Sequence, residues 1–195
     1  MSPTALSVQT PTSDESETIA SAFVSAAKAV LDAVPEPYRA GAHISWIPGF
    51  WLGTNTLVPW VVYQDTYVPY EPDASDNGAD HLIRVFHKLG QRYPALFTGQ
   101  RVLDIGVGSG PLAAYALTQG AAPVVGVDIL PGSIENTRAN LQQHLPEAAD
   151  RFRGYAGDVW DALPEAERRE PFGVVLCNAP PFEGDPRADH PEDYH

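Results

Sequence analysis

The chain has 195 residues, 12 Lys and Arg against 25 Asp and Glu, and a formal net charge of −13 at pH 7. Nucleic acids and anionic membranes are bound through clustered Lys and Arg, so this charge argues against both and favours a small neutral or cationic partner. A single cysteine, Cys177, excludes a disulfide within the chain. With no bilayer-length apolar run and no visible signal peptide, the chain is predicted to be cytoplasmic.

The N-terminal part divides into a tail and a helix. Residues 1–15 are rich in Ser, Thr, Pro and acids, which is typical of a disordered tail. Apolar residues then recur at helical spacing from Ile19 to Val34, and prolines end the pattern. Residues 16–76 are therefore predicted to form a helix and an aromatic-rich extension, and residues 77–195 to form the main domain.

Seven aromatic residues fall between Trp46 and Tyr70, where glycines and prolines exclude one long helix. The stretch TLVPWVVYQDTYV, residues 56–68, is predicted to form extended segments or a hairpin. Two interpretations of the rings stay open. They fill the core between the first helix and the main domain, or they line a substrate wall with Trp60 among the candidates.

From residue 77 onward helices and strands alternate. Asn77 is placed to cap a helix that ends at Gly90. Buried, β-branched runs then alternate with helical segments, which predicts the doubly wound α/β fold with a mostly parallel sheet. The expected strands are 101–107, 122–128, 152–158 and 172–178, and the expected helices are 111–120, 131–145 and 164–170.

The strongest motif is VLDIGVGSG, residues 102–110, in which a buried strand runs into a glycine-rich turn and then a helix. Glycines let the backbone turn sharply and let a ligand approach it, and a helix N-terminus favours an anionic group. A dinucleotide fingerprint would need a glycine at Pro111. Asp104 lies within the apolar strand, where an unpartnered carboxylate is costly and a purely structural turn is disfavoured. The glycines are Gly106, Gly108 and Gly110.

Two further acids end strands. Asp128 can accept hydrogen bonds from both hydroxyls of a ribose, with Ile129 offering an apolar face to a purine. Asp158 can accept from an exocyclic amino group while Val159 or Trp160 covers the ring. A lone strand-end Asp is as well explained by a helix cap or a turn, but three in series favour a ligand site.

The motifs VLDIGVGSG, GVDILPGSIENTRANL, GDVWDAL and VVLCNAPPF, in this order, resemble the first four of the class I S-adenosylmethionine-dependent methyltransferases. The resemblance covers about residues 78–183. It implies a Rossmann-like sheet of seven strands, of which four are visible, and S-adenosylmethionine as cofactor. It also implies that Asp104 and the glycines lie along the methionine half, Asp128 at the ribose, and Asp158 with Val159 at the adenine.

The sequence NAPPF, residues 178–182, is similar to the Asn-Pro-Pro-aromatic motif of enzymes that methylate planar nitrogens. The resemblance implies that Asn178 accepts a hydrogen from the attacking nitrogen, that Pro180 shapes the turn, and that Phe182 stacks on the acceptor. Ala179 stands where the first proline of the motif belongs. The structural alternative is a rigid proline exit from an edge strand.

The segment from Asp65 to Leu89 resembles the part that precedes the first motif in glutamine-amide methyltransferases, which makes Tyr67 and Tyr70 candidates for the cofactor or substrate wall. The acidic residues 183–195 match no standard metal-site spacing, so no metal is predicted. They form either a solvated loop or an acidic collar around a cationic acceptor.

Three functions stay open. The favoured one is N-methylation of a small molecule such as an amine, amide or guanidine. The second is methylation of a protein side chain, as in the glutamine enzymes, and the third is a non-catalytic cofactor-binding fragment or scaffold. Because four strands leave an apolar edge, a second copy of the chain, a partner chain or the N-terminal segments are expected to complete the sheet.

Overall fold

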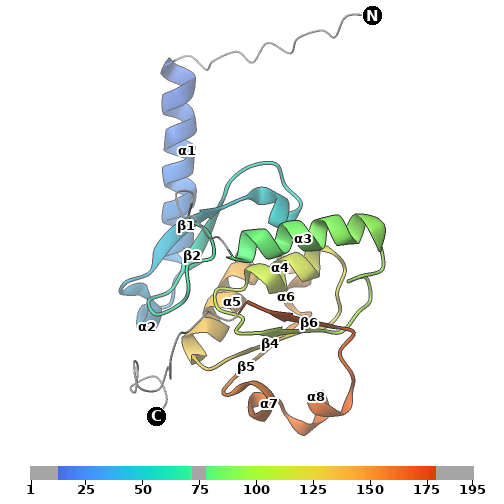
Figure 1. The fold of residues 1–195 in the computed structure, drawn as a ribbon. Helices are drawn as coiled ribbons and strands as arrows, with labels where there is room; N and C mark the ends of the chain where they lie inside the picture. The colour runs from blue at the N-terminus through green and yellow to red at the C-terminus, as the bar shows by residue number, and fades with distance from the viewer. Residues whose placement is uncertain (1–12, 72–77, 179–195) are drawn as a thin grey trace, which may run out of the picture.

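The computed structural model describes residues 13–71 and 78–178, and its centre is a four-stranded parallel sheet (Figure 1). The strand order is β5-β4-β3-β6 and every neighbouring pair is parallel. The chain therefore builds outward from β3 in one direction and then crosses to its other side. This order confirms the predicted doubly wound fold. The strands are β3 (Val102–Ile105), β4 (Val124–Asp128), β5 (Phe152–Ala156) and β6 (Val174–Cys177).

Helices cover both faces of this sheet, as right-handed crossovers require (Figure 1). The short helices α6 and α7 were not predicted, and α3 continues beyond Gly90 because that glycine does not adopt the left-handed conformation that ends helices. No helix in the described part of the chain is long and apolar enough to cross a membrane. One face carries α3 (Gly78–Arg92), α4 (Pro111–Thr118), α5 (Pro131–His144) and α6 (Pro146–Ala149), and the other carries α7 (Val159–Ala162) and α8 (Glu165–Arg169).

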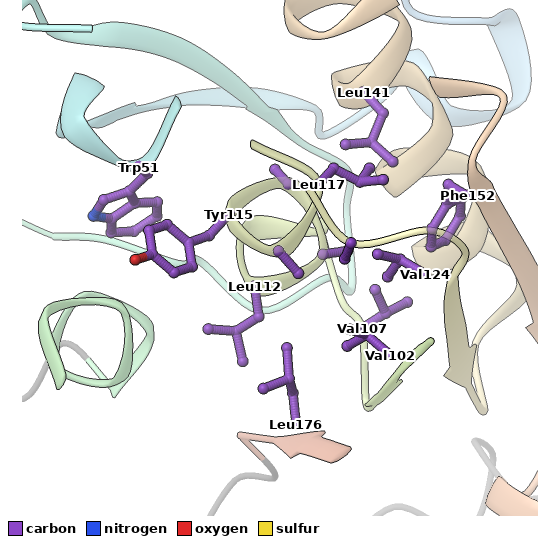
Figure 2. Packing of buried hydrophobic residues seen from close by; sticks show 14 of the residues in the cluster. Trp51, Val102, Val107, Leu112, Tyr115, Leu117, Val124, Leu141, Phe152 and Leu176 are labelled. Carbon is purple, nitrogen blue, oxygen red and sulfur yellow. The ribbon is translucent and has the colours of Figure 1, made fainter. Parts of the chain in front are cut away.

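The main core lies between the sheet and α4, which is buried over seven of its eight residues. A helix that is apolar all round belongs in an interior, and its alanines let it lie close to the strands. Figure 2 shows Leu112 and Leu117 of this helix pointing among strand residues such as Val124 and Leu176. The position of α4 matters for the site, because its N-terminus follows the glycine-rich turn directly.

The N-terminal extension consists of a long helix and a hairpin. Helix α1 (Ser13–Asp32) starts before residue 16, so the predicted tail is too long by at least three residues; residues 1–12 lie outside the described part. Its C-terminal end packs on the hairpin through Val30, while the rest extends away from the domain (Figure 1). The remaining elements are α2 (Glu36–Arg39), β1 (His43–Ile47), the 3-10 helix η1 (Gly49–Leu52) and β2 (Val58–Val62).

The hairpin differs from the predicted one. The stretch 56–68 contributes one strand, β2, whose antiparallel partner is β1, with His43 opposite Val62. The rings of Trp51 and Trp60 are fully buried, which confirms the core-filling interpretation for them. The aromatic segment thus joins the extension to the parallel sheet through packing.

Helix α8 is fixed to the opposite face by Glu167, which is 5% exposed. Its carboxylate accepts hydrogen bonds from Arg101, from Arg153 at 3.0 Å and from the Tyr155 hydroxyl at 3.0 Å. Burial alone would raise the pKa of Glu167, but these donors outweigh it and hold the pKa below its usual value. The Arg101 guanidinium also lies 3.9 Å from the Phe172 ring centroid.

We expect Glu167→Ala to lower the free energy of unfolding by about 3 kcal/mol, the lower end of the range for a broken buried pair. In this variant Arg101 would keep a buried charge without its Glu167 partner, whereas the half-exposed Arg153 can be solvated by water. The matched control is Glu165→Ala, which removes an exposed pair with Arg169 and should cost under about 1 kcal/mol. Urea denaturation checks both, and equal losses would contradict the assignment.

Candidate functional site

The predicted acids and glycines gather beyond the C-terminal ends of the parallel strands. The strand order reverses between β3 and β6, and in doubly wound sheets ligands bind at such a point. Three glycines of the loop 106–110 have positive φ, and at Gly106 an added Cβ would meet nothing within 4 Å. At Gly110 a Cβ would lie 2.7 Å from the Thr137 side chain. The loop therefore leaves space for a ligand beside its backbone at Gly106 and packs tightly against Thr137 of α5 at Gly110.

Asp128 ends β4 beside this loop. Its Oδ2 accepts a hydrogen bond from the Gly108 N–H at 2.9 Å, and its Oδ1 accepts one from the Leu130 N–H at 3.0 Å. A carboxylate has about four acceptor positions, so both oxygens keep capacity for two further donors such as ribose hydroxyls. Ile129, which is 42% exposed, follows it. The chemistry of this pair fits the predicted ribose and purine contacts.

Asp104 is the most unusual group of the site. It is 1% exposed, and neither carboxylate oxygen has a hydrogen-bond partner among the described residues. Burial raises its pKa to about 8; the Ala113 N–H opposes this without reaching hydrogen-bond geometry, and the charge of Asp128 adds to it. An unpartnered buried carboxyl is costly, and a cation bound beyond β3 would offset that cost. This orphaned acid fits a positively charged cofactor.

Asp158 and Val159 lie at the start of α7, next to the end of β4. The Gly157 N–H donates to the Asp128 carbonyl at 2.8 Å, which joins the two strand ends. The Asp158 side chain is exposed and makes no capping hydrogen bond to α7, so the helix-cap alternative is not what the structure shows. Val159 is 40% exposed with φ of 29°, an uncommon conformation for a β-branched residue. Their role at adenine stays a prediction.

Asn178 follows β6 on the other side of β3. It is half-buried, and its amide lies against Gly78, the first residue of α3: a Cβ added there would stand 2.8 Å from the Asn178 Oδ1. The start of α3 therefore fixes where this amide can lie. The other candidates of this motif, Pro180 and Phe182, lie outside the described residues, as do the acidic residues 183–195.

The three aromatic candidates for the substrate wall lie in different surroundings. The prediction is wrong for Trp60, because its ring is fully buried and stacks on His144 with centroids 5.4 Å apart. Tyr70 is half-buried, and its ring packs edge-on against Trp51 with the ring centroids 6.1 Å apart. Its backbone carbonyl accepts a hydrogen bond from the Ser45 hydroxyl. Tyr67 is 58% exposed and stays a prediction.

Four residues with a part in the site were missed from sequence. Gly78 gave no signal, because its neighbour Asn178 is 100 positions away. The other three are polar residues that α5 presents inward, in the run ENTRANL, and all are fully or almost fully buried. Polar residues on the inner face of a helix are such a signal, since buried polar groups need partners. They are Asn136, Thr137 and Asn140. Across residues 13–71 and 78–178 there is no cluster of metal-ligating side chains.

Comparison with known proteins gives the site its family context. Residues 102–190 match the family model described as a methyltransferase domain. The ribosomal protein L11 methyltransferase of Burkholderia orbicola is 40% identical over 80 residues, which are 41% of this chain and 23% of that protein. The enzyme of the same name from Burkholderia vietnamiensis is 41% identical over 80 residues, with the same shares of both chains. The chain thus spans about a quarter of the length of these relatives.

Solved structures also resemble the chain. A putative RNA methyltransferase from Pyrococcus horikoshii is 22% identical, with a TM-score of 0.39, over 80% of this chain and 58% of that one. Magnesium protoporphyrin IX methyltransferase from Synechocystis, with bound S-adenosylhomocysteine, is 20% identical, with a TM-score of 0.42, over 51% and 42% of the chains. Residues 102–190 of this chain thus match a methyltransferase domain.

The expectation of a small-molecule partner and no nucleic acid is contradicted, because the matched curated relatives are named for a protein of the ribosome. The expectation relied on a charge of −13 summed over the chain, whereas a macromolecule meets one local surface. Helix α3 shows how a local surface can differ from the net charge, because it exposes three basic side chains, those of Arg84, Lys88 and Arg92.

The raised pKa of Asp104 predicts that cofactor binding releases a proton. With a pKa of about 8, the free carboxyl is mostly protonated at pH 7, and a bound cation favours its charged form. Binding of S-adenosylmethionine should therefore strengthen as pH rises toward 8. Calorimetry at pH 7 in buffers of different ionisation enthalpy measures the release. Asp104→Asn should abolish it, and identical binding enthalpies for the parent protein in all buffers would contradict the prediction.

Proposed function

We propose that this chain is the cofactor-binding and catalytic part of an S-adenosylmethionine-dependent methyltransferase that methylates a nitrogen atom of a protein. The observation that carries the proposal is the meeting of Asp104, Asp128 and Asn178 at one edge of the sheet, on both sides of the switch point. The names of the curated relatives support a protein acceptor.

The residues divide into a cofactor side and an acceptor side. The cofactor supplies a methyl group activated on a positively charged sulfur. The glycine loop, Asp104 and Asp128 would bind and orient it from the ends of β3 and β4. Asn178, at the end of β6, would accept a hydrogen from the acceptor nitrogen and aim its lone pair at the methyl group. Catalysis then comes from positioning and fixed dipoles, with no covalent enzyme intermediate.

Transfer of label from methyl-tritiated S-adenosylmethionine to a total cell extract tests this function. We expect acid-precipitable label that protease removes, nuclease leaves, and mild alkali does not release, because N-methyl groups survive alkali and methyl esters do not. Label removed by nuclease would contradict the protein acceptor, and alkali-labile label would contradict the nitrogen. Intact cofactor binding with no transfer would support the non-catalytic alternative.

Asn178→Ala should lower kcat about 100-fold, the scale of a lost preorganised polar contact. The affinity for S-adenosylhomocysteine should change less than about threefold, because Asn178 lies on the acceptor side of β3. Steady-state kinetics with a calorimetric titration measures both. Near-normal turnover would mean that residues 178–182 are only a proline-rich strand exit.

Gly78→Ala should cause part of the same loss of kcat, although it leaves the Asn178 side chain itself unchanged. The new Cβ would stand 2.8 Å from Oδ1 and 3.3 Å from Nδ2 of Asn178, so this flexible side chain must move. We expect kcat to fall about tenfold or more, with the melting temperature preserved, on the scale of a misplaced catalytic group.

The matched control is Gly90→Ala in the same helix. A Cβ there meets nothing within 4 Å, and alanine favours a helix by roughly 0.5–1 kcal/mol over glycine. Gly90→Ala should therefore keep full turnover and gain stability. Equal turnover in both variants would show that the Asn178 position does not matter.

A further inference from the structure

The inner face of α5 pairs with the backbone of β2 as a neighbouring strand would. The Asn136 side chain accepts from the Tyr63 N–H at 2.9 Å and donates to the Val61 carbonyl at 2.9 Å. Asn140 accepts from the Val61 N–H at 3.0 Å and donates to the same carbonyl at 2.8 Å. An Asn side chain carries an amide like that of the backbone, so these two side chains supply the hydrogen bonds that the backbone of a neighbouring strand would supply.

The same helix holds the glycine loop from its other side. The Thr137 hydroxyl donates to the Gly108 carbonyl at 2.9 Å, and the Asn140 side chain donates to the Ser109 carbonyl at 3.0 Å. One amide, that of Asn140, thus contacts both the hairpin and the loop. The side chains that donate to the loop carbonyls therefore lie on one rigid element, α5.

These contacts are dry. Asn136, Thr137 and Asn140 are all 0% exposed, so water cannot replace a bond that is lost. A buried amide left without its partner costs far more than an exposed one. The loop itself has three glycines at positive φ and few side chains with which to support its shape. The separation between β2 and the loop is therefore set by α5.

We infer that the N-terminal hairpin is a functional part of the cofactor site, in which Asn136 and Asn140 act as positioning residues that transmit the position of β2 to the glycine loop. The inference rests on the proposed function. It assigns to residues 43–62, which lie outside the family match to residues 102–190, a role in cofactor affinity.

Three substitutions separate the two ends of this connection. Thr137→Val removes the loop contact alone, and Thr137→Ser restores the hydroxyl. Asn136→Ala removes hairpin contacts alone, since Asn136 has no hydrogen bond to the loop. We expect Thr137→Val to raise the Kd for S-adenosylhomocysteine about fivefold or more, Thr137→Ser to stay within about twofold of the parent, and Asn136→Ala to raise it about threefold or more.

Glu167→Gln controls for general loss of stability, because Glu167 lies on the opposite face and its hydrogen-bond partners Arg101, Arg153 and Tyr155 lie outside α5. It should lower the melting temperature at unchanged Kd. If Asn136→Ala leaves the Kd within twofold of the parent value, the connection between hairpin and loop is overturned. Should Asn136→Ala fail to fold, the next measurement decides on the unsubstituted protein.

Linkage requires the effect to be reciprocal. S-adenosylhomocysteine should slow hydrogen exchange at the Val61 and Tyr63 amides, which donate to Asn140 and Asn136. A merely structural hairpin would be slowed only as much as the amides that exchange through global unfolding, because any ligand of the folded state stabilises it as a whole. Protection confined to the loop 106–110 overturns this inference and leaves the proposed function standing, whereas absence of binding overturns the proposed function itself.

Discussion

The backbone of the glycine loop must be hydrogen-bonded beyond the regular pairing of β3 with its neighbours, and much of the domain is arranged around this requirement. The Gly106 and Val107 N–H groups both donate to the Val127 carbonyl, at 2.9 and 3.1 Å. The Gly108 N–H donates to the Asp128 carboxylate, and the Gly108 and Ser109 carbonyls accept hydrogen bonds from side chains of α5. Because buried backbone groups are nearly always paired, these partners fix the loop shape before any ligand arrives.

In the proposed function, this arrangement separates cofactor binding from methyl transfer. The groups on the cofactor side belong to β3, β4 and α5, whose relative positions are set by parallel pairing and by the loop contacts. Asn178 on the acceptor side belongs to β6, and its amide is limited by the start of α3. Substitutions on one side can therefore change affinity while those on the other change turnover. The division follows from the strand order, in which β3 lies between β4 and β6.

Sequence reasoning succeeded where contacts are local or follow from parallel pairing. The strands, the glycine turn and the placement of Asp104 and Asp128 toward the same edge of the sheet follow from short-range patterns and from parallel pairing. It failed for Trp60, because an aromatic residue near an expected site carries no information about which way its ring points. It also missed Asn136 and Asn140, whose hairpin partners lie more than 70 positions away. Net charge misled for the same reason, since it carries no spatial information.

The cost of the buried Asp104 is opposed by packing contacts from both the N-terminal extension and the main domain. A carboxyl with a pKa of about 8 destabilises the ionised free protein, so other contacts must hold β3 and its loop in place. Tyr115 of α4 lies beside Trp51 of the extension (Figure 2), while α5 connects β2 to the loop. A bound cation would favour the ionised form of Asp104, so in the proposed function this group would favour a positively charged cofactor over a neutral one.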